Sequence, residues 1–348
     1  MMTITRRATI KQVARAASVS TQTVSRVIND RPDVAPETRE RILRTIHEME
    51  YQPSALARSL IQQRSYTLGV VTAGLKYIGP SRTLNGIASA AEDAGYSLLL
   101  KELPRFDAGH VLPIFRALFS HHVDGVIWAV PEVGENRDWV AKLSLDSKSP
   151  VVHLTTEPRE NLSVVYVDNY LGGQIAVSHL LEQGYRRIGH VAGPMNWWEA
   201  RQRMRAWRDT LREAGFDASD EHWVEGNWSS ASGAQAMERL LERSSGMDSV
   251  FVANDQMALG VMQIAYQRRL KIPEDLGVVG FDDIPESAFY YPPLTTVQQD
   301  QHAVGRVAVE EIIKMIESSR KGSGSTEPRS VMLSPTLVKR ESSLRPQE

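Results

Sequence analysis

The sequence predicts an α/β protein in which a small all-α head precedes a larger body of two doubly wound lobes. Two observations support this prediction. Residues 1–64 contain three short helical patterns and an excess of basic residues, whereas the rest of the 348-residue chain alternates short apolar runs with amphipathic segments. Such alternation is typical of parallel sheets covered by helices on both faces. The series of runs is too long for one sheet, so we expect two.

The head is predicted to hold three helices. Residues 9–17 place apolar side chains at helical spacing behind Thr9, a suitable N-cap. Residues 20–29 direct two valines and an isoleucine inward, and residues 35–51 begin with Pro36 and repeat apolar residues at helical spacing. Only a short turn separates the first two helices. A head of about 50 residues lies at the small end of what folds alone.

Charge divides the chain at the same place. Residues 1–64 contain 11 Arg or Lys and 6 Asp or Glu, a net charge of +5, and the remainder contains 29 basic and 36 acidic residues, a net charge of −7. A basic head on an acidic body indicates a nucleic-acid module attached to something else.

The second helical segment has an unusual polar face. The stretch "SVSTQTVSRVIND" is rich in hydroxyl groups and also carries a Gln, an Arg and an Asn. A helix that faced only water would more usually carry Glu and Lys. These short hydrogen-bonding side chains favour contact with a partner that is rich in acceptors.

The body begins after residue 66. Strand-like runs lie at 67–71, 96–100, 125–129, 150–154, 163–167, 187–193, 249–253 and 276–281. Helical patterns separate them, as in βαβ units. Residues 318–330 form a Gly/Ser-rich loop, and residues 331–342 are predicted as one final strand with a tail.

Polar and aromatic side chains follow several of these strands. Ligands bind beyond the carboxyl ends of the strands in doubly wound sheets. The residues concerned are Tyr77, Pro80, Trp197, Trp198, Arg201, Arg203, Trp228, Asn254, Asp255, Asp282 and Asp283. Carboxylate, amide and guanidinium groups beside aromatic faces suit a polyhydroxylated ligand such as a sugar. A single strand-end Asp more often caps a turn or helix, and a single Trp more often packs in a core, but the convergence favours a pocket.

Composition and motifs exclude several classes. The chain has no cysteine, no apolar run near the ~20 residues of a membrane span and no secretory h-region, so we expect a cytoplasmic protein without membrane partners. Phosphate-binding glycine motifs, a nucleophile elbow and metal-spaced His pairs are absent. We therefore expect no enzyme activity, no metal and no cofactor. The strand-end acids leave a glycosidase pair as an open alternative.

The segment "TIKQVARAASVSTQTVSRVINDRPDVAPETRERILRTIHEMEYQPSALARSLIQQRSYTLGVV" resembles the head of the LacI/GalR family of bacterial transcription regulators. In the body, "VDNYLGG", "VANDQMALGVMQ", "LGVVGFDDIPES" and "PPLTTVQQD" match family signatures in the same order. The resemblance covers nearly the entire chain. It implies a helix-turn-helix head, a hinge helix and a two-lobed body like that of periplasmic binding proteins.

The resemblance also implies domain boundaries. We expect the DNA-binding head at 1–52, the hinge helix and linker at 53–65 and the effector-binding domain at 66–348. Within that domain, the first lobe is expected at about 66–165 and 301–328, and the second at about 166–300 and 329–348.

By the same resemblance, the second helix of the head lies in the major groove. Thr21, Gln22 and Arg26 are then expected to read base edges, because Gln matches adenine and Arg matches guanine. The remaining expected DNA contacts of the head are Thr9, Ser20, Thr23, Ser25, Asn29 and Tyr51. In the hinge, Leu60 is expected to wedge into the minor groove, and Ala57 to allow close approach of paired hinge helices.

The family pattern also suggests the effector contacts. Arg203 and Asp282 are the foremost candidates, and Arg203 is preferred to Arg201 because it lies four residues before Trp207. The further expected contacts are Tyr77, Pro80, Trp197, Trp228, Asn254 and Gln299. Where lac-type members carry an aromatic and an amide, this chain has Gln301 and Ala129. A sugar is still expected, but galactoside specificity does not transfer directly, and a glucoside or longer oligosaccharide is an alternative.

These inferences predict a sequence-specific repressor of carbohydrate-utilisation genes. It is expected to bind near-palindromic double-stranded operator DNA as a homodimer, with a mono- or disaccharide between the lobes as effector. The chain has no leucine-heptad tail after "RESSLRPQE", which favours a dimer over a tetramer. A purine- or nucleoside-responsive co-repressor type is the alternative within the family. A periplasmic sugar-binding protein is the alternative from another class.

Overall fold

The computed structural model describes residues 8–28, 31–51, 64–103, 111–133, 136, 149–321 and 327–345. It forms two compact units, Met1–Tyr66 and Thr67–Glu348. No helix within these ranges has both the length and the apolar character that a membrane span requires.

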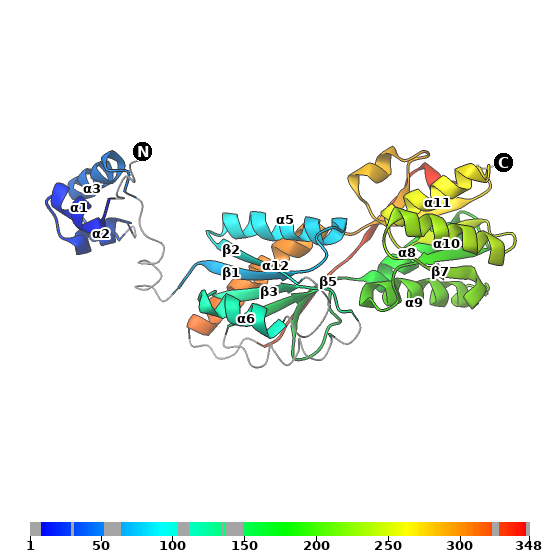
Figure 1. Cartoon of the computed structure of the whole chain (residues 1–348), viewed down its shortest axis with the longest axis horizontal. Helices are drawn as coiled ribbons and strands as arrows, with labels where there is room; N and C mark the ends of the chain where they lie inside the picture. The colour runs from blue at the N-terminus through cyan, green and yellow to red at the C-terminus, as the bar shows by residue number, and fades with distance from the viewer. Residues whose placement is uncertain are drawn as a thin grey trace. The chain divides into compact units, whose positions relative to one another are not determined.

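The first unit contains α1 (Ile10–Ala16), α2 (Thr21–Ile28) and α3 (Pro36–Glu48) (Figure 1). The Thr9 side chain accepts from the Gln12 backbone while the Gln12 side chain accepts from the Thr9 backbone, so a reciprocal capping box starts α1. Ser18, at a φ of 50°, supplies the left-handed residue of the turn before α2. The head core contains Val13, Ala14, Ala17, Val24, Val27, Val34 and Ile42.

The second unit contains two six-stranded sheets, one in each lobe. In sheet order, the first consists of β11 (Ser330–Leu333), β5 (Ser163–Val167), β4 (Val151–Leu154), β3 (Gly125–Ala129), β1 (Thr67–Thr72) and β2 (Ser97–Glu102). Every pairing in it is parallel.

The second sheet has the same design with one difference. In sheet order, it consists of β12 (Thr336–Val338), β10 (Thr295–Gln298), β9 (Gly277–Asp282), β8 (Ser249–Val252), β6 (Ile188–Ala192) and β7 (Trp223–Glu225). Its pairings are parallel except for the antiparallel edge strand β12.

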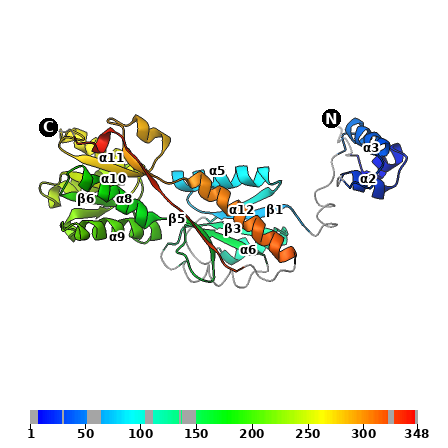
Figure 2. The same cartoon turned by 180° about the vertical axis from the view of Figure 1, so that it is seen from behind.

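Helices cover both faces of each sheet. In the first lobe, α5 (Ile78–Asp93) packs against α12 (Gln301–Arg320) on one face, and α6 (Val111–Ser120) lies on the other (Figures 1 and 2). In the second lobe, the packed pairs are α8 (Asn169–Glu182) with α9 (Trp198–Glu213), and α10 (Ser230–Arg243) with α11 (Asp255–Gln267). The 3₁₀ turns η2 (Asp220–His222), η3 (Pro285–Phe289) and η4 (Glu341–Ser343) complete this lobe.

Along the described elements, the chain crosses between the lobes three times. The crossings follow β5, β10 and β11, as Figure 1 shows. The expectation that the chain returns to the second lobe at about residue 329 is wrong for Ser330–Leu333, because β11 pairs with β5 in the first sheet, whereas β12 pairs with β10 in the second. The predicted single final strand is in fact two strands in different sheets. They are separated at Ser334–Pro335, where proline lacks the N–H that a continuous ladder needs.

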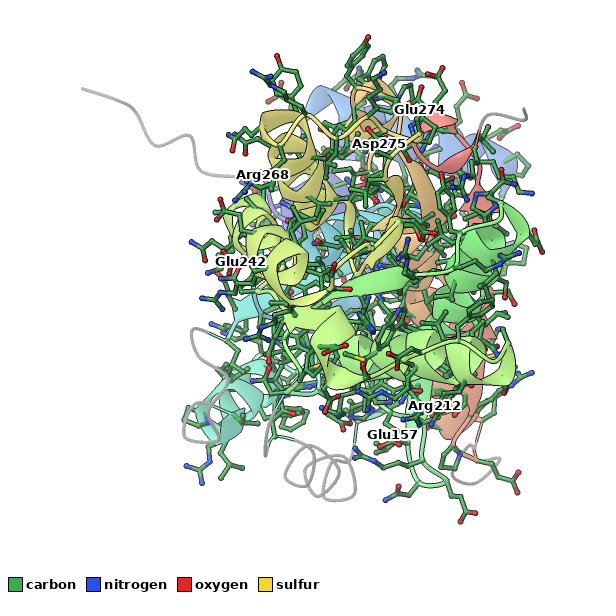
Figure 3. All side chains as sticks on the ribbon, turned by 90° about the vertical axis from the view of Figure 1, so that its right-hand side faces the viewer. Glu157, Arg212, Glu242, Arg268, Glu274 and Asp275 are labelled. Carbon is green, nitrogen blue, oxygen red and sulfur yellow. The ribbon has the colours of Figure 1, made fainter. Side chains whose placement is uncertain are left out.

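The far end of the second lobe is a solvated surface. Figure 3 shows charged side chains of both signs there, including Glu242, Arg268, Glu274 and Asp275. All four are exposed. They supply positions for control substitutions outside the cavity described below.

Candidate functional site

A cavity lies between the two lobes. It encloses about 940 Å³ of empty space, including the part open to solvent, and residues from both sheets and their following loops line it. All eight residues proposed from the sequence as ligand contacts lie in its wall: Tyr77, Pro80, Trp197, Arg203, Trp228, Asn254, Asp282 and Gln299. The structure brings these residues together, and their binding role stays a prediction.

Arg203 is the fixed cation of the cavity. It is 4% exposed, and its Nε donates to Asn169 Oδ1 at 2.9 Å while Nη1 donates to the Ala253 carbonyl oxygen. Its guanidinium carbon lies 3.6 Å from the centre of the Phe281 ring. Arg201, by contrast, donates to the Met195 carbonyl oxygen and does not line the cavity.

Asp282, at the end of β9, faces Arg203. Its Oδ1 lies 3.9 Å from Arg203 Nη1 and accepts a hydrogen bond from Gln299 Nε2. Burial raises the pKa of Asp282 to about 6, and the nearby guanidinium and the Gln299 amide only partly oppose this effect. Because a buried carboxylate is stabilised by hydrogen-bond donors, a ligand that donates to Asp282 would favour its ionised form.

Asn254 and Trp228 form a connected part of the wall. Asn254 Oδ1 accepts from the Met257 N–H at 2.9 Å and caps α11, while Nδ2 donates to the Trp228 carbonyl oxygen at 3.0 Å. The Trp228 ring packs against Gly193, where a Cβ atom would lie only 2.1 Å from the indole. Glycine at 193 is therefore required for this indole position.

Backbone strain gathers at the cavity. Thr155, Trp228 and Asp282 line it with φ values of 52°, 72° and 118°. Positive φ costs non-glycine residues roughly 1–2 kcal/mol each. Strain of this kind is retained where the surrounding structure fixes it, often at binding sites.

Aromatic rings form two groups in the wall. Tyr77 meets Trp197 edge-to-face at 6.2 Å, and Trp197 meets Trp228 at 5.8 Å. Separately, Tyr166 meets Trp198 edge-to-face at 5.9 Å. Each group combines residues of both lobes, so the two lobes pack aromatic side chains together along the cavity.

Polar contacts also join the lobes. Val133 forms an isolated antiparallel bridge with Trp197, and the backbone N–H of Trp198 donates to the Glu132 carbonyl oxygen. Arg82 donates to the Asp283 carbonyl oxygen at 3.3 Å. The structure therefore shows the lobes in contact.

Several lining residues were not proposed from the sequence, namely Tyr166, Asn169, Glu199 and Gln256. Asn169 lies in the family signature "VDNYLGG", just after a strand, and this position could have indicated a cavity residue. Glu199 gave no such signal, because an acid in a first helical turn normally indicates only a favourable helix dipole. Ala129 and Gln301, named as departures from the lac-type pattern, also line the cavity.

One group of potential metal ligands lies elsewhere on the second lobe. Ligand atoms of Asp217, Glu221 and His222 lie within 4.8 Å of one another. Both His222 nitrogens already have partners, Ser244 Oγ at 2.6 Å and Asp217 Oδ2 at 3.0 Å. This is the geometry of a surface hydrogen-bond network that fixes the 217–222 turn.

The head presents the polar face of α2. Thr21, Gln22 and Arg26 are exposed, and Arg26 Nη1 lies 3.3 Å from Asp33 Oδ2. Ser20 Oγ accepts from the Thr23 N–H at 3.0 Å and so caps α2.

The other proposed DNA contacts divide into two groups. Thr9 is exposed and caps α1, Ser25 is half-buried, and Tyr51 packs against the head core. Asn29, Ala57 and Leu60, with most of the expected 53–65 hinge, lie outside the described residues.

Comparison with known proteins places these features in a family. Residues 9–54 match the model of the lacI family of bacterial regulatory proteins, and residues 177–343 match a periplasmic binding protein-like domain. The chain is 33% identical over 335 residues to the HTH-type transcriptional repressor PurR of Haemophilus influenzae (strain PittEE), covering 96% of this chain and 98% of that protein. The chain belongs to the LacI family. The predicted family and fold class are thus confirmed.

Other LacI-family proteins are similar over nearly their whole length. The ribose operon repressor of Escherichia coli (strain K12) is 32% identical, with 96% of this chain and 99% of that protein covered. A solved lac repressor dimer bound to operator and the anti-inducer ONPF matches with a TM-score of 0.86 and 29% identity, over 97% of this chain and 100% of that one. A CelR–cellobiose complex matches with a TM-score of 0.71 and 30% identity, over the same shares.

Proposed function

We propose that this LacI-family regulator is a repressor of carbohydrate-utilisation genes whose operator affinity is controlled by a small sugar bound between its lobes. The observation that carries the proposal is the cavity wall, where the Arg203–Asp282 pair and the Asn254 amide lie beside the Trp228 ring. Hydroxyl groups of a sugar accept from guanidinium and amide donors and donate to the carboxylate, while an indole covers the apolar ring face.

Several relatives support a sugar. The similar proteins include a ribose operon repressor, a lactose operon repressor that is 30% identical over 97% of this chain and 91% of its own, and a regulator solved with cellobiose. The lac repressor was solved as a dimer on its operator, which supports a homodimer on near-palindromic DNA.

The cavity supplies a physical route for control. Its wall draws on both lobes, so a ligand that contacts both favours one lobe arrangement over another. The resulting change in operator affinity is limited by the ligand's differential affinity for the two arrangements.

A purine co-repressor is the second candidate. It is favoured by the 33% identity to PurR over 96% of this chain. A planar base would stack on an indole face and use the same polar groups as hydrogen-bond partners.

Operator binding with an effector panel distinguishes the candidates. Full-length protein is titrated onto a fluorescent palindromic operator, and anisotropy is measured with ribose, glucose, galactose, lactose, cellobiose, hypoxanthine or guanine. A shift in affinity with one or more sugars supports the proposal, and its direction separates induction from co-repression. A shift with a purine alone replaces the sugar with the second candidate.

A further inference from the structure

Three buried polar atoms in the cavity wall have no hydrogen-bond partner among the described residues. They are Trp198 Nε1, Glu199 Oε2 and Trp228 Nε1. The three residues are 6%, 8% and 8% exposed, so water has little access to these atoms. Buried donors and acceptors are nearly always paired in native proteins, and leaving one unpaired is costly. These three atoms are therefore candidates for pairing with a bound ligand.

The chemistry of these atoms selects the ligand class. Two indole N–H donors and one carboxyl group match hydroxyl groups, because a hydroxyl both donates and accepts. Among the described residues, the charged side chains in the wall are Arg203, Asp282 and Glu199, so Arg203 already faces two acids. Within the described part of the wall, no second cation is available for a phosphate, which favours a neutral ligand.

The cavity wall draws on several strands of the first sheet. Tyr166 belongs to β5, whereas Tyr77 follows β1, and β4 and β3 lie between these two strands. Three strand spacings separate β5 from β1 by about 14 Å. The Tyr166–Trp198 pair starts from β5, the Tyr77–Trp197–Trp228 group includes the loop after β1, and the two groups adjoin at the consecutive residues Trp197 and Trp198.

We propose that Trp198 and Glu199, backed by Tyr166, form a second sugar subsite, so that the effector is a neutral disaccharide or a glycoside of that length. One ring binds at Arg203, Asp282 and Asn254 beside Trp228. The second ring accepts from Trp198 Nε1 and donates a hydroxyl hydrogen bond to Glu199. The inference rests on the sugar-responsive function proposed above and names its ligand more closely.

Calorimetric titration of the full-length protein tests the subsite. The probes are glucose and galactose as single rings, and cellobiose, gentiobiose, maltose and lactose as disaccharides. At least one disaccharide is expected to bind at least about tenfold tighter than its own monosaccharides, since a second ring adds hydrogen bonds and stacking.

Two variants assign that gain to the named residues. Glu199→Ala is expected to weaken the disaccharide about tenfold and to leave monosaccharide affinity unchanged. Trp198→Phe keeps an aromatic ring but removes Nε1–H, and it should weaken the disaccharide by a smaller factor. Glu242→Ala, on the exposed end of the second lobe, is the matched control and should change neither affinity. Thermal unfolding checks that each variant is folded.

The outcomes separate the two proposals. Equal affinities for single and double rings, or a disaccharide preference that survives in Glu199→Ala, overturn the subsite and leave the sugar effector standing. Binding of hypoxanthine or guanine with no sugar binding overturns the sugar effector and the subsite together. Failure of every sugar in the panel to bind counts against both.

Discussion

Glu199 shows at a single residue how the cavity wall constrains ionisation. Burial raises its pKa from 4.5 to about 7, and Arg203 and Arg201 only partly oppose the shift, while Glu132 adds to it. Between pH 4.5 and 7 the unfolded chain gives up this proton more readily than the folded protein does. The ligand-free protein therefore loses stability as pH rises through this window, by about 3 kcal/mol at most from this group.

Glu199→Gln should remove this loss. The free energy of unfolding of the variant, relative to the unsubstituted protein, is expected to be higher at pH 8 than at pH 5, because glutamine does not ionise. Urea unfolding at the two pH values without ligand measures the difference. Glu242→Gln, at an exposed position, is the control, and an identical pH dependence in all three proteins would contradict the burial argument.

Asp282→Ala tests the effector contact at the end of β9. The variant removes the acid that faces Arg203 and accepts from Gln299, so the effector response should be lost. Operator affinity without effector should persist, since the head carries the proposed DNA contacts. Anisotropy with and without the active sugar measures both, with Asp275→Ala as an exposed control. An unchanged effector affinity would remove Asp282 from the set of contacts.

Residue roles could be predicted only where one local pattern implied them. Asn254 follows a strand and was proposed as a pocket residue, and in the structure it both caps α11 and lines the cavity. Glu199 was not predicted as a cavity residue. Its burial depends on the first lobe packing over the start of α9, and no local sequence pattern indicates that contact.

Among the elements, α2 offers the sharpest test of DNA reading. The Arg26–Asp33 ion pair has side chains 48% and 54% exposed, so breaking it costs little and the guanidinium is free to meet a base. Arg26→Ala is expected to lose ~1–3 kcal/mol of discrimination at one base pair. Anisotropy against operators substituted at each position measures this loss.

Arg44→Ala in α3 is the matched control for that experiment. Arg44 is an exposed cation that pairs with Glu40, and it has no proposed base contact. Its removal should leave sequence preference unchanged. Equal losses from Arg26→Ala on every operator would mean that Arg26 contacts phosphates and reads no base.

Strand prediction succeeded for the longer apolar runs, at a sheet edge as well as in the interior, and failed for several of the shortest strands. The runs that became β1, β2, β3, β4, β5, β6, β8 and β9 were predicted, and β2 among them is an edge strand. The interior strand β10 was not predicted, although three of its four residues are buried. The edge strands β7 and β12 have only three residues each, too few to show a period. Their place depends on neighbouring strands, and the break between β11 and β12 was missed although Pro335 was a signal for it.

At the scale of the whole molecule, charge separation predicts a strong salt effect. Residues 1–64 carry a net charge of +5 and the remainder −7, so the attraction to DNA comes from the head. The logarithm of operator affinity should fall linearly with the logarithm of KCl concentration, because phosphate contacts release counterions. Anisotropy at several KCl concentrations gives the slope. A slope near zero would contradict an electrostatic contribution from the head.

The head and the two-lobed architecture could be predicted from the sequence, but the residue contacts between the lobes could not. Alternating strands and helices specified two doubly wound lobes, and the charge division marked the head. Contacts such as that of Trp198 with Glu132 join residues that are distant in the chain, and no sequence period predicts them.

The three crossings also govern the order in which the protein matures during synthesis. The head is continuous in sequence and emerges complete, whereas the first lobe must wait for α12 and β11, and the second for β12. A ribosome that terminates before Gln301 therefore releases a head attached to two unfinished lobes. Because domains fold as units when their chain is available, the cavity between the lobes forms only after α12, β11 and β12 have been translated.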